Sequence, residues 1–149
     1  AGLYGPSASG KSFLGLSMAS AIASGDRWFG YCIEPAPVIY VALEGEAGLK
    51  LRVKALEVHN GRTLPDGLNL MLQPFKLTDP RDINDLAAVV PVGAVVFIDT
   101  LNRAAPSADE NSSRDMGEIL EAAKRLQTLT GWLVVLVHLS FGLLPIGNA

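Results

Sequence analysis

Residues 5–12 read GPSASGKS and complete the pattern G-x-x-x-x-G-K-[ST] almost at the start of the chain. Glycines in this pattern let the backbone wrap around a phosphate group, so that several N–H groups point inward and the positive end of the next helix adds attraction. The pattern therefore demands a strand before it and a helix after it. Leu3 and Tyr4 fit the end of a strand, and residues 12–24 (SFLGLSMASAIAS) fit a buried helix of small side chains.

The side chains of this loop predict a binding site for a nucleoside triphosphate. Lys11 is expected to reach the β- and γ-phosphates, and the Ser12 hydroxyl is expected to take one position on Mg²⁺. The alternative, a glycine- and serine-rich surface turn, is disfavoured by the flanking strand and helix. The predicted nucleotide-binding residues are Gly5, Pro6, Ser7, Ala8, Ser9, Gly10, Lys11 and Ser12.

Length and composition indicate one domain with a substantial core, because 49% of the 149 residues are hydrophobic and 18% are charged. No apolar run approaches the length of about 20 residues that spans a bilayer, so no membrane partner is expected. Cys32 is the single cysteine, which excludes an internal disulfide or a cysteine metal cluster and suits a cytoplasmic location. The net charge of −3 gives no overall basic field for nucleic acid, although a ring-shaped motor can hold DNA with a few residues.

Strand and helix patterns alternate along the rest of the chain. Three apolar runs lack period-two alternation, which is typical of parallel strands covered on both faces, and a fourth run alternates as a strand nearer the sheet edge does. The expected strands are 38–43, 94–98 and 132–137, with 68–72 at the edge, and the expected helices are 46–58, 82–90 and 112–130. Ser112 with Asp115 predicts the cap of the last helix, and Gly131 predicts its end. The fold class is therefore α/β, with a mostly parallel sheet sandwiched by helices.

Asp99 ends the apolar run AVVFID. An acidic residue at the carboxyl end of a buried strand, beside a phosphate-binding loop, is where a Walker B aspartate holds the shell of Mg²⁺. The alternative is a strand-terminating aspartate that caps the following loop. With the phosphate-binding loop in the same chain, we predict the metal role for Asp99, together with Ser12.

Glu44 follows the strand predicted before it, in VIYVALEGE. Parallel sheets gather functional groups at the carboxyl ends of their strands, and a carboxylate there can orient and deprotonate the water that attacks the γ-phosphorus. Glu46 competes for this role, but it is better explained as the acid that opens the next helix. Glu44 is the predicted catalytic base, against the alternatives of a capping or solvated side chain.

His138 ends the last apolar run, WLVVLVH. A single histidine after a hydrophobic strand is usually the first solvated residue. The same edge of the sheet is predicted to carry the phosphate-binding loop, Glu44 and Asp99, so a sensor of the γ-phosphate becomes the functional interpretation of His138.

Four segments, GPSASGKSFL, VIYVALEGE, VVFIDTLNRAAPSADENSSRDMG and LVVLVH, follow one another in a familiar order and spacing. Over residues 3–138 the chain resembles the RecA-like AAA ATPases of the RepA hexameric replicative helicase group. The resemblance implies a RecA-type sheet and the cofactors ATP and Mg²⁺. It also implies hydrolysis at the subunit interfaces of a homo-oligomeric, hexameric ring that moves along single-stranded DNA.

The resemblance also assigns roles to individual residues. Lys11 and Ser12 match Walker A, Glu44 the glutamate after the second strand, Asp99 Walker B, and His138 the histidine of the third motif. Arg52 stands where such proteins often carry an arginine, although a solvated Lys50/Arg52/Lys54 face explains it as well. Asp109 and Glu110 match the loop after Walker B, although the dipole of the following helix explains them equally.

The resemblance departs at both ends of the chain. The third motif of the family usually runs His-His-x-Gly-Lys, whereas residues 139–149 (LSFGLLPIGNA) are apolar and show neither a helical nor a strand period. The strand before the phosphate-binding loop is also short. These departures predict a RecA-like ATPase core over residues 1–138, incomplete at both ends, and an atypical apolar tail over residues 139–149.

Three functional classes fit these observations. The first is the ATP-hydrolysing core of a helicase-type ATPase that acts on DNA, with Lys11, Glu44 and His138 as catalytic residues. The second is a nucleotide-binding module without turnover, and the third is a P-loop small-molecule kinase. Such a kinase usually closes a basic lid over the transferred phosphate, and no arginine-rich insert follows His138, so the first class is favoured.

Overall fold

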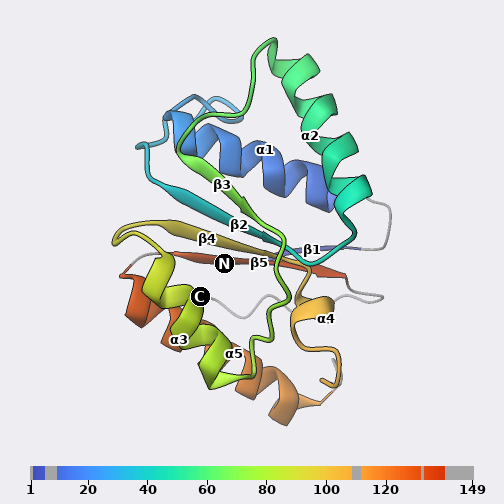
Figure 1. Ribbon diagram of the computed structural model, residues 1–149, viewed down its shortest axis with the longest axis vertical. Helices are drawn as coiled ribbons and strands as arrows, with labels where there is room; N and C mark the ends of the chain where they lie inside the picture. Colours follow the sequence, from blue (N-terminus) through green and yellow to red (C-terminus); the bar gives the residue numbers. More distant parts are fainter. Residues whose placement is uncertain (1, 6–9, 109–111, 132, 140–149) are drawn as a thin grey trace.

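Helices alternate with strands in the computed structural model, which describes residues 2–5, 10–108, 112–131 and 133–139 (Figure 1). The strands are β1 (Gly2–Gly5), β2 (Val38–Ala42), β3 (Leu68–Met71), β4 (Val95–Asp99) and β5 (Val134–Leu139). The helices are α1 (Lys11–Ser24), α2 (Glu46–Asn60), α3 (Pro80–Val89), α4 (Leu101–Ala104) and α5 (Ser113–Thr130).

The five strands form one sheet in the order β1-β5-β4-β2-β3, and every neighbouring pair is parallel. β5 therefore lies between β1, which leads toward the phosphate-binding loop, and β4, which ends at Asp99. β3 lies at the edge of the sheet, which confirms the position predicted from its alternating sequence. α1, α2 and α4 each begin within a few residues of the end of a parallel strand, and so near the carboxyl edge of the sheet, where the site residues are expected.

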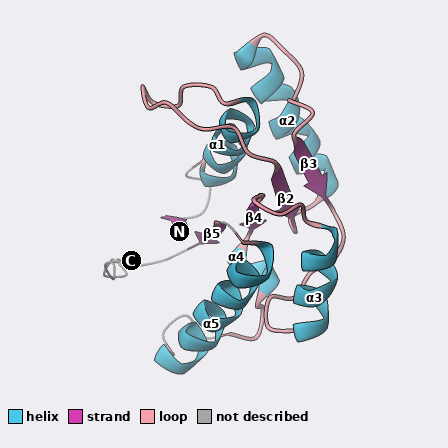
Figure 2. Ribbon diagram, turned by 90° about the vertical axis from the view of Figure 1, so that its left-hand side faces the viewer, coloured by secondary structure: helices cyan, strands magenta, loops and turns pink. Residues whose placement is uncertain are grey.

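Two layers of helices bury the sheet on both faces (Figure 1, Figure 2). α1 and α2 cover one face, and α3, α4 and α5 cover the other. All five residues of β2 and all five of β4 are buried as a result, which explains why their sequences show no alternation. The buried helix residues include Leu16, Leu49 and Leu56 on the first face, and Ile83, Leu101 and Ile119 on the second. This architecture confirms the predicted α/β class.

Some predicted boundaries shift. β5 begins at Val134 and reaches Leu139, two residues later at each end than predicted, and α3 begins at Pro80, whose ring fixes a helical φ at the first position. The one-turn helix α4 is not predicted from the sequence, since four residues are too few to show a helical period. Within the described ranges, every helix is too short or too polar to cross a membrane.

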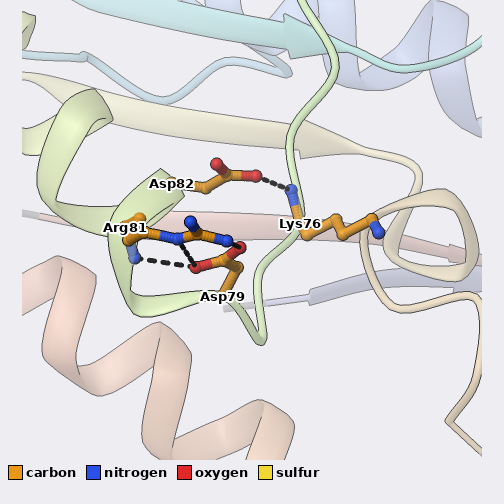
Figure 3. Close-up of polar contacts among 4 residues, drawn as sticks. All are labelled: Lys76, Asp79, Arg81 and Asp82. Carbon is orange, nitrogen blue, oxygen red and sulfur yellow. Dashed lines mark hydrogen bonds and ion pairs between the residues drawn. The ribbon is translucent and has the colours of Figure 1, made fainter.

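The start of α3 is closed by its own side chains (Figure 3). The carboxylate of Asp79, the N-cap residue, accepts from the backbone N–H of Arg81 at 2.9 Å and from the Arg81 guanidinium at 3.3 Å and 3.4 Å. Asp82, in the first turn, accepts from the backbone N–H of Lys76 at 2.8 Å. Two donors near the helix start thus have partners within the chain, and two carboxylates face the positive end of the helix.

α5 has the cap that its sequence predicts. The Ser112 hydroxyl accepts from the backbone N–H of Asp115 at 3.2 Å, and the helix ends at Gly131, whose φ of 74° lies in the left-handed region that glycine adopts at little cost. Both predicted signals are confirmed. Their local character explains the success, because a cap depends on neighbours in sequence and not on the packing of the sheet.

Candidate nucleotide site

α1 begins where the phosphate-binding loop ends. Gly10 is its N-cap residue, with a left-handed φ of 78°, and its carbonyl accepts from the backbone N–H of Leu14 at 2.9 Å. Lys11 is the first helical residue, and only 9% of its surface is exposed. Glycine is the residue that adopts this backbone conformation without strain, and it brings no side chain to the helix start. Gly5 ends β1, whereas the predicted loop residues Pro6, Ser7, Ala8 and Ser9 lie outside the described residues.

Ser12 and Asp99, the two residues that the sequence predicts to bind the metal, form a hydrogen bond across the domain. The Ser12 hydroxyl donates to Oδ1 of Asp99 at 3.1 Å, which joins the first turn of α1 to the end of β4. Asp99 is 2% exposed. Two residues that are 87 positions apart in the chain therefore form one polar pair at the carboxyl edge of the sheet.

A third polar residue, Tyr40 of β2, completes this pair. Its hydroxyl donates to Oδ2 of Asp99 at 2.6 Å, and it lies 3.4 Å from the backbone carbonyl oxygen of Ser12. The Tyr40 ring is 1% exposed and stacks on Phe97 of β4, with ring centroids 5.6 Å apart. Both oxygens of the buried Asp99 carboxylate thus accept a hydrogen bond from a side chain.

Burial dominates the electrostatics of this cluster. It raises the pKa of Tyr40 far above its ordinary value, and the negative charge of Asp99 adds to the rise, so Tyr40 stays protonated as a donor. Burial also raises the pKa of Asp99, while the hydrogen bonds from Tyr40 and Ser12 act in the opposite direction. A buried negative charge is unfavourable unless it is paired. The Asp99 carboxylate, which already accepts two hydrogen bonds, is therefore suited to bind a cation that balances its charge.

The chemistry of these residues fits Mg²⁺. A serine hydroxyl and a carboxylate are the hard oxygen donors that this ion prefers, and the ion commonly takes only one or two protein ligands alongside phosphate oxygens and water. The described part of the chain contains no group of three His, Cys, Asp or Glu side chains that could hold a metal by themselves. Ser12 and Asp99 are therefore suited to a metal that arrives with a phosphate group.

Glu44 and Glu46 take different positions after β2. Glu44 lies two residues beyond the strand, is partly buried, and its charge contributes to raising the pKa of Asp99. Glu46 is exposed at the start of α2 and forms an ion pair with Lys50 at 2.9 Å. The backbone N–H of Leu43 donates to the carbonyl oxygen of Asp99 at 2.7 Å, which fixes the segment before Glu44 against the end of β4. This placement agrees with the helix-opening role expected for Glu46.

The charge of Arg52 in α2 also affects the pKa values of this cluster. This positive charge partly opposes the rise in the pKa of Asp99 and Tyr40. Arg52 is partly buried, whereas Lys50 and Lys54 are exposed. The guanidinium lies over Gly48, one turn earlier in the helix. Arg52 is thus distinguished from the solvated lysines on either side of it.

The backbone of His138 lies in β5, opposite Tyr4 of β1 and one residue beyond Val137, which pairs with Asp99 of β4. The predicted sensor position therefore falls between the strand before the phosphate-binding loop and the strand that carries Asp99. Asp109 and Glu110, also considered from the sequence, lie outside the described residues.

Sequence patterns did not single out two residues of this region. Tyr40 is hidden in the apolar run VIYVAL, although a tyrosine buried between aliphatic neighbours needs a partner for its hydroxyl, and this need is a usable signal. Thr100 follows Asp99 directly, and its buried hydroxyl has no hydrogen-bond partner among the described residues. No sequence pattern marks Thr100, because a threonine after a strand is common.

Comparisons with known proteins concern the family and the fold of the chain. A family model described as an AAA domain matches residues 1–139. The crystal structure of the RadB recombinase is similar to the chain, with a TM-score of 0.58 and 23% sequence identity, and the match covers 93% of this chain but only 60% of the recombinase chain. No curated protein sequence matches. At this identity the likeness concerns the fold, and it confirms the predicted RecA-like arrangement of a parallel sheet between helices.

Proposed function

We propose that this chain, which belongs to the AAA domain family, binds ATP with Mg²⁺ and hydrolyses the terminal phosphate. The observation that carries the proposal is the hydrogen bond of 3.1 Å between Ser12 and Asp99. It brings the last residue of the phosphate-binding motif against a buried carboxylate. In P-loop ATPases, a hydroxyl and a carboxylate in these two positions hold the magnesium shell. The family and the fold support the same proposal.

The residues of the candidate site have different roles in this proposed reaction. The buried ammonium group of Lys11 offsets the charge of the β- and γ-phosphates, and Ser12 and Asp99 hold the metal and its water shell. Bound Mg²⁺ supplies charge neutralisation at the phosphate oxygens. Glu44 accepts a proton from the attacking water, and His138 contacts the γ-phosphate at the neighbouring strand end.

The proposal extends to work on DNA. The RecA-like fold and the resemblance to the RepA group favour a helicase-type ATPase, a homo-oligomeric ring around single-stranded DNA, and a cytoplasmic location. The similar solved structure is named as a recombinase, which favours DNA as the partner without favouring unwinding. The match covers 60% of the recombinase chain, so any activity of a whole protein belongs to the proposal.

ATP hydrolysis by the purified chain, measured with and without single-stranded DNA, tests the proposal. Hydrolysis that requires Mg²⁺, is lost in Lys11→Ala and rises with DNA is the expected result. Nucleotide binding without hydrolysis would instead identify a binding module, and transfer of the phosphate to a small molecule would identify a kinase. No binding of ATP at all would contradict the whole proposal.

A further inference from the structure

We propose that Tyr40 is a positioning residue for the metal site, because its hydroxyl fixes the Asp99 carboxylate in the orientation that presents Oδ1 to Ser12. This inference rests on the proposed binding of ATP with Mg²⁺. Tyr40 belongs to β2, which lies next to β4 in the sheet, so it acts on Asp99 from a neighbouring strand and has no need to contact nucleotide.

The geometry gives each carboxylate oxygen one side-chain donor. Tyr40 donates to Oδ2 at 2.6 Å, and Ser12 donates to Oδ1 at 3.1 Å. The terminal torsion of an aspartate is broad, so one donor alone leaves the carboxylate free to rotate over a wide range. The second donor on the opposite oxygen removes this freedom. The shorter of the two bonds is the one from Tyr40, whose hydroxyl also lies 3.4 Å from the backbone carbonyl oxygen of Ser12.

The ring of Tyr40 is itself fixed. It stacks on Phe97 at an interplanar angle of 19°, and the two residues are register partners on β2 and β4. In addition, a Cβ atom added at Gly15 of α1 would lie 3.5 Å from the Tyr40 hydroxyl, so α1 approaches the hydroxyl closely. Strand pairing, stacking and helix contact thus place the hydroxyl oxygen with little room to move.

A phenylalanine would supply the same stack and nearly the same packing. The additional hydroxyl of Tyr40 therefore needs a separate reason, since burying a hydroxyl is unfavourable unless it is hydrogen-bonded. Its 2.6 Å bond could serve stability alone, or it could serve the orientation of Asp99. The two roles differ in one respect, because only the second changes how the site responds to the concentration of Mg²⁺.

The test is Tyr40→Phe, with Tyr31→Phe as the matched control at an exposed tyrosine of the loop before β2. A fluorescent ATP analogue is titrated into each variant at increasing Mg²⁺ and also in EDTA. In Tyr40→Phe, the Mg²⁺ concentration for half-maximal binding should rise about 10-fold or more, the usual effect of losing a partner that orients a metal ligand. In EDTA, the affinity of Tyr40→Phe for the analogue should equal that of the native chain. The control variant Tyr31→Phe should match the native chain in every measurement.

A second variant keeps the inference testable if Tyr40→Phe does not fold. Phe97→Leu keeps the Tyr40 hydroxyl but removes the ring on which it stacks, so a smaller shift in the same direction is expected. An unchanged Mg²⁺ dependence in Tyr40→Phe, or in Phe97→Leu if only that variant folds, would overturn the inference. If the native chain binds no nucleotide, the proposed function fails and the inference fails with it. If the native chain binds nucleotide and both variants show the Mg²⁺ dependence of the native chain, only the inference fails.

Discussion

α1 and α3 begin in opposite ways. α3 starts at Asp79, whose carboxylate accepts from the helix backbone and from Arg81, while Asp82 reaches back to Lys76 (Figure 3). α1 starts at Gly10, which has no side chain that could accept from the helix backbone. α2 also starts at a glycine, Gly45. The chain thus caps α3 with its own carboxylate, whereas the N-cap residues of α1 and α2 have no side chain that could accept from the helix backbone.

This difference indicates that some helix starts contribute to stability and others to ligand binding. The first backbone N–H groups of any helix need acceptors, and a side-chain cap supplies one at a gain in stability. Where the acceptor is a ligand, a side-chain cap would compete with it for the same groups. The contrast between α1 and α3 therefore predicts that substitutions near α1 change binding and catalysis, whereas substitutions at the start of α3 change only stability.

The largest effect is expected from Lys11→Ala at the start of α1. The substitution removes a buried positive charge beside the predicted phosphates, and a hydrogen bond to a charged group is worth enough to lower nucleotide affinity about 100-fold. Titration with a fluorescent ATP analogue measures the loss, and circular dichroism checks that the fold is kept. An unchanged affinity and turnover would contradict the ligand role of the α1 start.

Glu44→Gln should lower the rate of hydrolysis by about 100-fold or more and leave nucleotide affinity unchanged, because a general base acts on the rate and not on binding. Single-turnover hydrolysis measures the effect. The matched control is Glu46→Gln, two residues later, where the carboxylate is occupied by Lys50 at the exposed surface. Loss of turnover in Glu46→Gln and not in Glu44→Gln would transfer the role to the other glutamate.

Asp79→Ala should lower the melting temperature of the domain by about 2–4 °C, since it removes the N-cap acceptor of α3. Ser112→Ala at the start of α5 is the matched comparison and should act in the same direction. Nucleotide affinity should not change in either variant. A clear loss of affinity would break the division between capped helices and site helices.

The smallest effect concerns pH. The pKa of Asp79 lies below its ordinary value of 3.8, first because the backbone N–H of Arg81 donates to it, and further because of the Arg81 side chain. A lowered folded-state pKa means that the stabilisation is present above the ordinary value and is lost as the pH falls through the folded value. The difference in melting temperature between the native chain and Asp79→Ala should therefore shrink below pH about 4. A constant difference down to pH about 2 would refute this role.

The sequence predicted the caps of α5 and the place of Asp99 at the end of a strand, whereas β5 lies two residues later than predicted. Ser12 and Asp99 were expected to share a metal, and the hydrogen bond between them places both at one edge of the sheet. The caps at Ser112 and Gly131 were predicted because they depend on near neighbours. Tyr40 was not recognised, because its partner Asp99 is 59 positions away and strand order alone brings the two together. Strand order depends on long-range packing, which hydrophobic periodicity does not encode.

The position of β1 in the sheet has a consequence for how the domain is made. Within the described residues, β1 pairs only with β5, and Gly2 lies opposite Leu136. Joining segments about 130 residues apart carries an entropic cost and slows folding. On the ribosome, β2, β3 and β4 can assemble while β5 is still being synthesised, but β1 has no strand to join until then. A nascent chain therefore acquires the strand of Asp99 before β5 is made, and β1, which leads to the phosphate-binding loop, joins the sheet only afterwards.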